Sequence, residues 1–142
     1  MRKLDTIILH CTATKFDHDI SVEDINIWHK ARGFKMCGYH YLVKLDGTIE
    51  FGRPLDMVGA HCRGFNKHSV GIAYAGGIDE HKQSSNTMNE VQEDSIFFLI
   101  ESLAIVFGDL RLLGHNDLTD LKSCPNFNVG EWWVDQQKNE IR

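Results

Sequence analysis

The sequence predicts an α/β fold of the mixed α+β kind, in which helices flank a central mixed β-sheet. Short apolar runs of strand length, such as Thr6 to Leu9 and Ser69 to Tyr74, alternate with longer segments of helical periodicity. An Asp46-Gly47 pair between two further strand-like runs marks an antiparallel hairpin. Strands that alternate with helices in this way usually form one sheet covered by helical layers.

The first half of the chain contains one strand, one helix and the hairpin. Ser21 is a favourable N-cap, Ile25 and Trp28 follow at helical spacing, and Gly33 is a favourable helix stop. The expected elements are a strand at 6–9 that ends at His10, a helix at 22–32, and hairpin strands at 39–43 and 48–51.

The second half repeats this alternation. Thr87 and Glu90 have the spacing of a capping box, which predicts the start of a long helix, and Gly108 ends it. Asn128 is a candidate N-cap for a short last helix. The predicted buried stripe of the long helix consists of Phe97, Ile100, Ala104 and Phe107. The expected elements are a strand at 69–74, a helix at 87–107, a strand at 111–113 and a helix after position 128.

Length and composition fit one domain that spans residues 1–142. The 20 acidic residues outnumber the 15 basic ones and no basic run is present, so composition argues against a surface that binds nucleic-acid phosphates. No apolar stretch reaches the roughly 18–20 residues that span a bilayer, and no apolar signal region follows the N-terminal Lys3. We therefore expect a monomer synthesised in the cytoplasm without a signal peptide, with neither nucleic acid nor membrane as partner.

Three residues form a candidate metal site. His10 and His115 each follow a predicted strand, and Cys124 comes shortly after the second histidine. Two imidazoles and a thiolate suit Zn²⁺, and three protein ligands leave a catalytic zinc one position for a water whose pKa falls to about 7. The spacing alone favours a simpler interpretation, with two surface histidines and a buried cysteine.

Motifs in a fixed order add a resemblance to this pattern. They extend from about Thr6 to Trp133 and comprise 8–14, 22–32, 38–43 with 47–53, 59–66 with 69–72, and 114–117 with Cys124-Pro125. On these segments the chain resembles the N-acetylmuramoyl-L-alanine amidase type 2 family, which includes phage lysins and animal peptidoglycan recognition proteins. One departure is a gap from His115 to Cys124 that is one residue longer than close relatives have, which a loop at Leu118 to Leu121 would absorb at little cost.

The resemblance implies the fold of the amidases and peptidoglycan recognition proteins, and a set of roles. His10, His115 and Cys124 would bind Zn²⁺. Tyr39 would lie beside the metal, as general base or as orienter, and Lys122 would stabilise developing charge. The simpler interpretations are a sheet aromatic for Tyr39 and a solvated side chain for Lys122. The cleft residues expected to contact the peptidoglycan or muropeptide substrate are His61 and Asn66.

The remaining histidines, cysteines and tryptophans have structural interpretations. His40 alternates with Tyr39 and is expected on the opposite sheet face as a hydrogen-bonded structural residue. The residues expected at the surface are His18, His29, His68 and His81. The residues expected in core or lid packing are Cys11, Cys37, Cys62, Trp132 and Trp133.

Three functions remain open at this point. The leading one is hydrolysis of the amide between the lactyl group of N-acetylmuramic acid and L-alanine, by a phage lysin that reaches the wall after release or by a cytoplasmic enzyme that recycles muropeptides. The second is a non-catalytic peptidoglycan-binding module, which is expected to lack the cysteine ligand that Cys124 supplies here. The third is a structural zinc site, for which Asp117 or Asp120 would have to be a fourth ligand.

Overall fold

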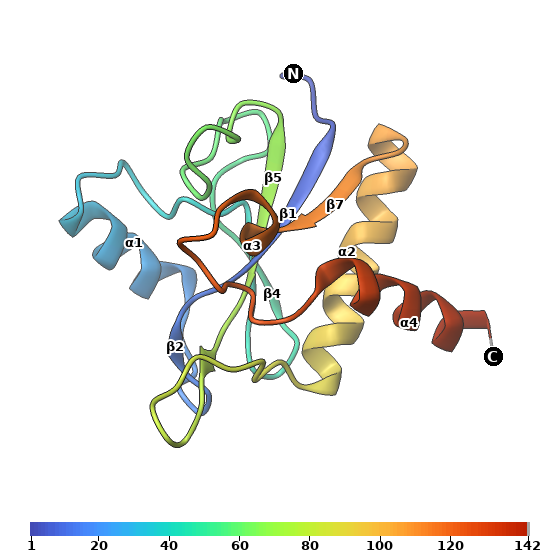
Figure 1. The fold of residues 1–142 in the computed structure, drawn as a ribbon. Helices are drawn as coiled ribbons and strands as arrows, with labels where there is room; N and C mark the ends of the chain where they lie inside the picture. The colour runs from blue at the N-terminus through green and yellow to red at the C-terminus, as the bar shows by residue number, and fades with distance from the viewer. Residues whose placement is uncertain (142) are drawn as a thin grey trace.

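A five-stranded mixed sheet forms the centre of the computed structural model, which describes residues 1–141 and their side chains as far as Asn139 (Figure 1). The strand order is β4-β3-β5-β1-β7. The strands are β1 (Thr6–Cys11), β3 (Tyr41–Val43), β4 (Ile49–Phe51), β5 (Ser69–Tyr74) and β7 (Arg111–Gly114). β5 and β7 both pair parallel to β1, and β3 pairs parallel to β5, whereas β4 pairs antiparallel to β3. The predicted mixed sheet is confirmed.

Helices cover both faces of this sheet (Figure 1). They are α1 (Val22–Ala31), α2 (Glu90–Phe107), α3 (His115–Leu118) and α4 (Val129–Ile141). α2 and α4 share a hydrophobic core with β1 and β5, while Ile25 of α1 packs in a second cluster with Leu42 of β3. Among the described residues, no helix combines the length and the apolar character that a membrane crossing requires.

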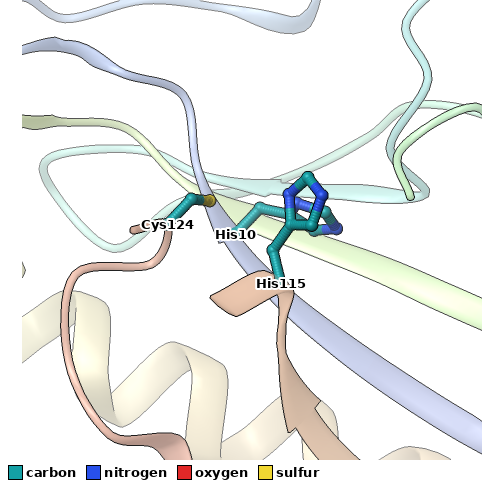
Figure 2. A group of neighbouring side chains, drawn as sticks. All are labelled: His10, His115 and Cys124. Atoms are coloured by element: carbon teal, nitrogen blue, oxygen red, sulfur yellow. The ribbon is translucent and has the colours of Figure 1, made fainter. Parts of the chain in front are cut away.

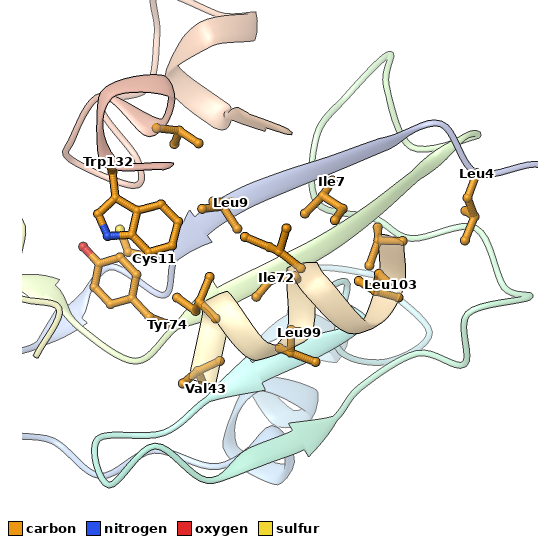
Figure 3. Close-up of a cluster of buried hydrophobic side chains, with 14 residues drawn as sticks. Leu4, Ile7, Leu9, Cys11, Val43, Ile72, Tyr74, Leu99, Leu103 and Trp132 are labelled. Carbon is orange, nitrogen blue, oxygen red and sulfur yellow. The ribbon is translucent and has the colours of Figure 1, made fainter. Parts of the chain in front are cut away.

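The alternation of side chains along β1 separates the core from the candidate site. Ile7, Leu9 and Cys11 belong to the core beneath α2 and α4 (Figure 3). Ile8 and His10 are also buried but stand outside that core, because successive strand residues point to opposite faces. His10 is therefore held on the face away from α2, near the carboxyl end of a strand that is buried from Ile7 onward.

The start of α2 differs from the prediction. The N-cap is Asn89, whose side chain accepts from the backbone N–H of Gln92, while the Gln92 side chain accepts from the N–H of Asn89. Thr87 does not cap the helix, because its hydroxyl accepts a hydrogen bond from the Gly77 N–H instead. The predicted buried stripe is also displaced, since Ala104 is exposed. The buried α2 residues are Gln92, Ile96, Leu99, Ile100 and Leu103.

Two small features have no counterpart in the prediction. β2 (Thr14–Lys15) and β6 (Gly77–Ile78) pair as a separate two-stranded parallel sheet. α3 is a single helical turn directly after β7, and the Asp117 carboxylate caps it by accepting from the Gly114 N–H. Both features are too short for a period to be visible in the sequence.

Gln92 ties α2 to the sheet, and its replacement by methionine is expected to lower the free energy of unfolding by about 2–3 kcal/mol. Its side-chain amide is fully buried and donates to the carbonyls of Ala75 and Val43 at 3.0 and 3.4 Å. Gln92→Met keeps the volume but removes the side-chain donor to the buried Ala75 carbonyl and the acceptor of the Asn89 N–H, whereas the Val43 carbonyl keeps the Ala75 N–H as a donor. Urea unfolding would measure the loss. The exposed Gln83→Met is the control, and equal stability of the two variants would contradict this assignment.

Candidate metal centre

The strand register brings the first two candidate ligands together. β1 and β7 are neighbouring parallel strands, so their carboxyl ends lie at the same sheet edge. Leu9 pairs with Gly114, and the residue that follows each of them in the sequence is a histidine. His10 is the second-to-last residue of β1, and His115 is the first residue of α3. Their ring centroids are 4.8 Å apart.

Cys124 reaches the same edge from the loop after α3. The Asn116 backbone N–H donates to the Cys124 carbonyl at 2.8 Å, and the Asn116 side-chain amide donates to the carbonyls of Ser123 and Phe127. The backbone N–H of Cys11 donates to the Cys124 sulfur at 3.0 Å. The hydrogen bonds of Asn116 therefore hold the loop in place. The Cys124 thiol lies against the end of β1.

The structure thus brings together the three residues that the sequence analysis singled out (Figure 2). One potential ligand atom from each of His10, His115 and Cys124 lies within 4.8 Å of the other two. Two borderline nitrogen donors and one soft sulfur are a donor set that fits Zn²⁺. His10 is buried, whereas His115 and Cys124 are half-buried, so the group is enclosed on one side and accessible to solvent on the other.

The charge state of the histidines suits a metal site. Burial, followed by the neighbouring His61 and His115, lowers the pKa of His10 well below its usual range. Burial also lowers the pKa of His115, and the Lys122 ammonium adds to this. Both rings are therefore neutral near pH 7, which is the form that binds metal.

The thiol behaves differently. The hydrogen bond between the thiols of Cys124 and Cys11 raises the pKa of Cys124, burial adds to this, and Lys122 acts in the opposite direction. A bound divalent cation offsets such a shift because coordination deprotonates a thiol. Metal affinity is accordingly expected to fall as the pH is lowered.

Tyr39 and Lys122 lie beside the three candidate ligands. The Tyr39 ring lies 5.2 Å from the His10 ring and 5.6 Å from the His29 ring, centroid to centroid. Burial, followed by the nearby cysteines, raises the pKa of Tyr39, so its hydroxyl keeps its proton at neutral pH. Lys122 is exposed, and its charge acts on both His115 and Cys124.

His61 and Asn66 adjoin the site and are heavily engaged within the protein. The His61 ring is buried 4.9 Å from the His10 ring, centroid to centroid. Burial, followed by His40 and His115, lowers the pKa of His61 to about 3. The Asn66 side-chain carbonyl accepts from the backbone N–H groups of His61 and Cys62. That these two residues contact substrate stays a prediction.

The expectation that His29 lies at the surface is wrong. Its ring is buried, its Nδ1 accepts from the Gly38 N–H at 2.8 Å, and it packs against Tyr39. His29 follows Ile25 by four residues, so both lie on the inward face of α1. That spacing was the available signal. Through these contacts of His29, α1 positions the segment that carries Tyr39.

His40 is the hydrogen-bonded structural histidine that was expected, but it does not lie on the opposite face from Tyr39. Its Nδ1 accepts from the Gly71 N–H at 3.0 Å, and its Nε2 lies 2.9 Å from the Met57 carbonyl. Its ring lies 5.8 Å from the His61 ring, so it joins the same group of rings. The regular strand begins only at Tyr41, so strict alternation does not apply to the residues before it.

Protonation of His40 is expected to destabilise the protein in acid. Burial, with Arg2 and Arg53 nearby, lowers the pKa of His40 to about 4. In the unfolded chain His40 is protonated below about pH 6.5, whereas in the folded protein it stays neutral down to about pH 4. The free energy of unfolding therefore falls by about 3 kcal/mol as the pH is lowered through this range. Denaturant unfolding as a function of pH should show a shallower fall for His40→Gln. The exposed His68→Gln should follow the wild type, and an unchanged slope in His40→Gln would contradict the prediction.

Comparison with known proteins places this geometry in a family. Residues 1–127 match the family model for N-acetylmuramoyl-L-alanine amidase. The chain belongs to this amidase family. An endolysin of Klebsiella phage KP32 is 37% identical over 135 residues, covering 95% of this chain and 87% of that protein.

Solved amidase structures share the fold. The N-acetylmuramoyl-L-alanine amidase LysC from Clostridium intestinale is 28% identical, with a TM-score of 0.81 over 97% of this chain and 87% of that one. Drosophila PGRP-LB shares the fold at 24% identity, with a TM-score of 0.71 over 88% of this chain and 76% of that one. The resemblance to the amidases and peptidoglycan recognition proteins and the predicted fold class are both confirmed.

Proposed function

We propose that this chain is a zinc-dependent N-acetylmuramoyl-L-alanine amidase that hydrolyses the amide between the lactyl group of N-acetylmuramic acid and L-alanine. The observation that carries the proposal is the convergence of His10, His115 and Cys124, with potential ligand atoms within 4.8 Å of one another. When bound there, zinc would supply a water of lowered pKa and polarise the scissile carbonyl. Asp117 is unsuited as a fourth ligand because its carboxylate caps α3.

The residues around this group have complementary roles in the proposal. The Tyr39 hydroxyl, protonated at neutral pH, donates a hydrogen bond to the oxygen on which negative charge develops. This favours an orienting and stabilising role over that of general base. The exposed Lys122 ammonium, next to His115 and Cys124, stabilises the same charge from the open side.

Among the sources of substrate, the intact cell wall is the one we propose. The chain covers most of a phage endolysin at 37% identity, which supports a lysin that is made in the cytoplasm and reaches the peptidoglycan when the membrane is breached. A recycling enzyme would instead act on soluble muropeptides, and a recognition module would bind without cutting. Cys124 supports the enzyme over the recognition module, because a binder has no need of a complete ligand set.

A product analysis tests the proposal. Purified sacculi and soluble muropeptides are each incubated with the protein as purified, after chelation, and after zinc is restored. The expected result is release of new alanine amino termini without new reducing ends, faster from sacculi, abolished by chelation and restored by zinc. New reducing ends, binding without cleavage, or full activity in the chelator would contradict the proposal, and preference for muropeptides would favour the recycling role.

A further inference from the structure

We propose that His61 is a positioning residue that fixes which nitrogen of His10 is available to a metal. In this inference, which rests on the proposed function, a chain of hydrogen bonds leads from His10 through His61 and Ser69 to the backbone carbonyl of Phe65. These hydrogen bonds place the proton of the neutral His10 ring on Nε2. Nδ1 of His10 is left as the metal-binding nitrogen.

The chain consists of three contacts. Nε2 of His10 lies 2.8 Å from Nδ1 of His61 in a buried setting. Nε2 of His61 lies 3.2 Å from the Ser69 hydroxyl oxygen, which is also buried. The Ser69 hydroxyl donates to the Phe65 carbonyl at 2.7 Å. This series of hydrogen bonds ends at the Phe65 carbonyl oxygen, which can only accept. That acceptor fixes which atom is the donor in each of the two preceding hydrogen bonds.

The direction follows from counting protons. A hydroxyl has one proton, and the short bond from Ser69 to the Phe65 carbonyl uses it, so Ser69 can only accept from His61. Nε2 of His61 must then carry the proton of the neutral ring, and its Nδ1 must accept. Nδ1 of His61 therefore accepts the proton on Nε2 of His10. A neutral His10 has no second proton, so its Nδ1 presents a lone pair.

Packing prevents the His61 ring from leaving this orientation. A Cβ atom at Gly71 would lie 2.6 Å from the His61 ring, and one at Gly59 would also lie 2.6 Å from it. These two glycines create the space that the ring fills. The loop that carries it is fixed by Asn66, whose carbonyl oxygen accepts the His61 N–H at 3.0 Å. A buried ring with both nitrogens engaged is suited to orient a neighbour and poorly suited to bind substrate.

Zinc affinity gives one test. Partners that hydrogen-bond to a metal-binding histidine typically contribute about 10–100-fold to metal affinity. We expect His61→Leu to raise the zinc dissociation constant by about that factor, and Ser69→Ala to raise it by about tenfold. His61→Asn, whose side-chain oxygen lies near the position of Nδ1, should recover part of the loss. His18→Leu, the same change at an exposed histidine, should bind zinc like the wild type.

Nitrogen-15 NMR of the histidine rings gives a second test that needs neither metal nor activity. The full chain in chelator is expected to show His10 protonated on Nε2 and unprotonated on Nδ1, with Ser69→Ala shifting His10 toward a mixture of tautomers. His10 protonated on Nδ1 in the wild type would overturn the inference. So would a His61→Leu variant that is folded by circular dichroism and binds zinc as tightly as the wild type. If His10→Ala abolishes zinc binding while His61→Leu does not, the inference fails and the proposed function stands.

Discussion

Cys124→Ser is expected to lower the rate of wall lysis by at least about a thousandfold, because several kcal/mol of transition-state stabilisation depend on a bound cation. Serine nearly preserves the volume and can still accept the backbone N–H of Cys11 that the sulfur accepts at 3.0 Å. Its hydroxyl does not ionise near neutral pH, so the two histidines lose their anionic partner. The expected defect is chemical and leaves the fold in place.

Zinc content by mass spectrometry and lysis of purified sacculi, measured on the same preparations, check this expectation. Cys62→Ser is the control, since Cys62 is also a free cysteine but is buried outside the candidate ligand group. The control should keep both its zinc and its activity. Lysis by Cys124→Ser at more than a few per cent of the wild-type rate would show that the Cys124 thiolate is not required for catalysis.

Tyr39→Phe is expected to lower kcat by about 100- to 1000-fold while zinc remains bound, since the change removes one hydrogen-bond donor to developing negative charge. The ring, which lies 5.2 Å from the His10 ring, stays in place and only the hydroxyl is lost. Because substrate binding does not depend on that hydroxyl, KM should change little. The residue would thereby be shown to act in the transition state.

The control for Tyr39 is Tyr41→Phe two residues along the chain. Tyr41 packs against the hydrophobic core beneath α2, so its hydroxyl has no place in the proposed chemistry. Steady-state kinetics on a defined muropeptide would separate kcat from KM for both variants. An unchanged kcat in Tyr39→Phe, or loss of zinc with the hydroxyl, would contradict the assigned role.

The sheet was predictable because its strands are marked locally. The run from Thr6 to Leu9 is apolar and β-branched, Ser69 to Tyr74 is closed by Gly76-Gly77, and Asp46-Gly47 forms the hairpin turn. The start of α2 was displaced because two polar residues competed for the same role. Asn89 satisfies the helix end together with Gln92, while the Thr87 hydroxyl accepts from Gly77.

The candidate site was predictable in its ligands and less so in their surroundings. Strand ends and a family resemblance identified His10, His115 and Cys124, but the hydrogen bonds that hold them join residues far apart in sequence. His10 and His61, whose ring nitrogens lie 2.8 Å apart, are 51 positions apart in the sequence. No local pattern in the sequence reveals that contact. His29 differs from these residues, because its four-residue spacing from Ile25 was a local signal of burial that the surface prediction overlooked.

X-ray absorption at the zinc edge of the purified protein would identify the atoms bound to the metal. We expect one sulfur at about 2.3 Å and three light atoms at about 2.0–2.1 Å, two of which belong to imidazoles. Cys124→Ser should lose the sulfur signal together with the metal. A spectrum with no sulfur neighbour, or with two sulfurs and therefore with Cys11 as a further ligand closing the site, would contradict a catalytic zinc held by His10, His115 and Cys124.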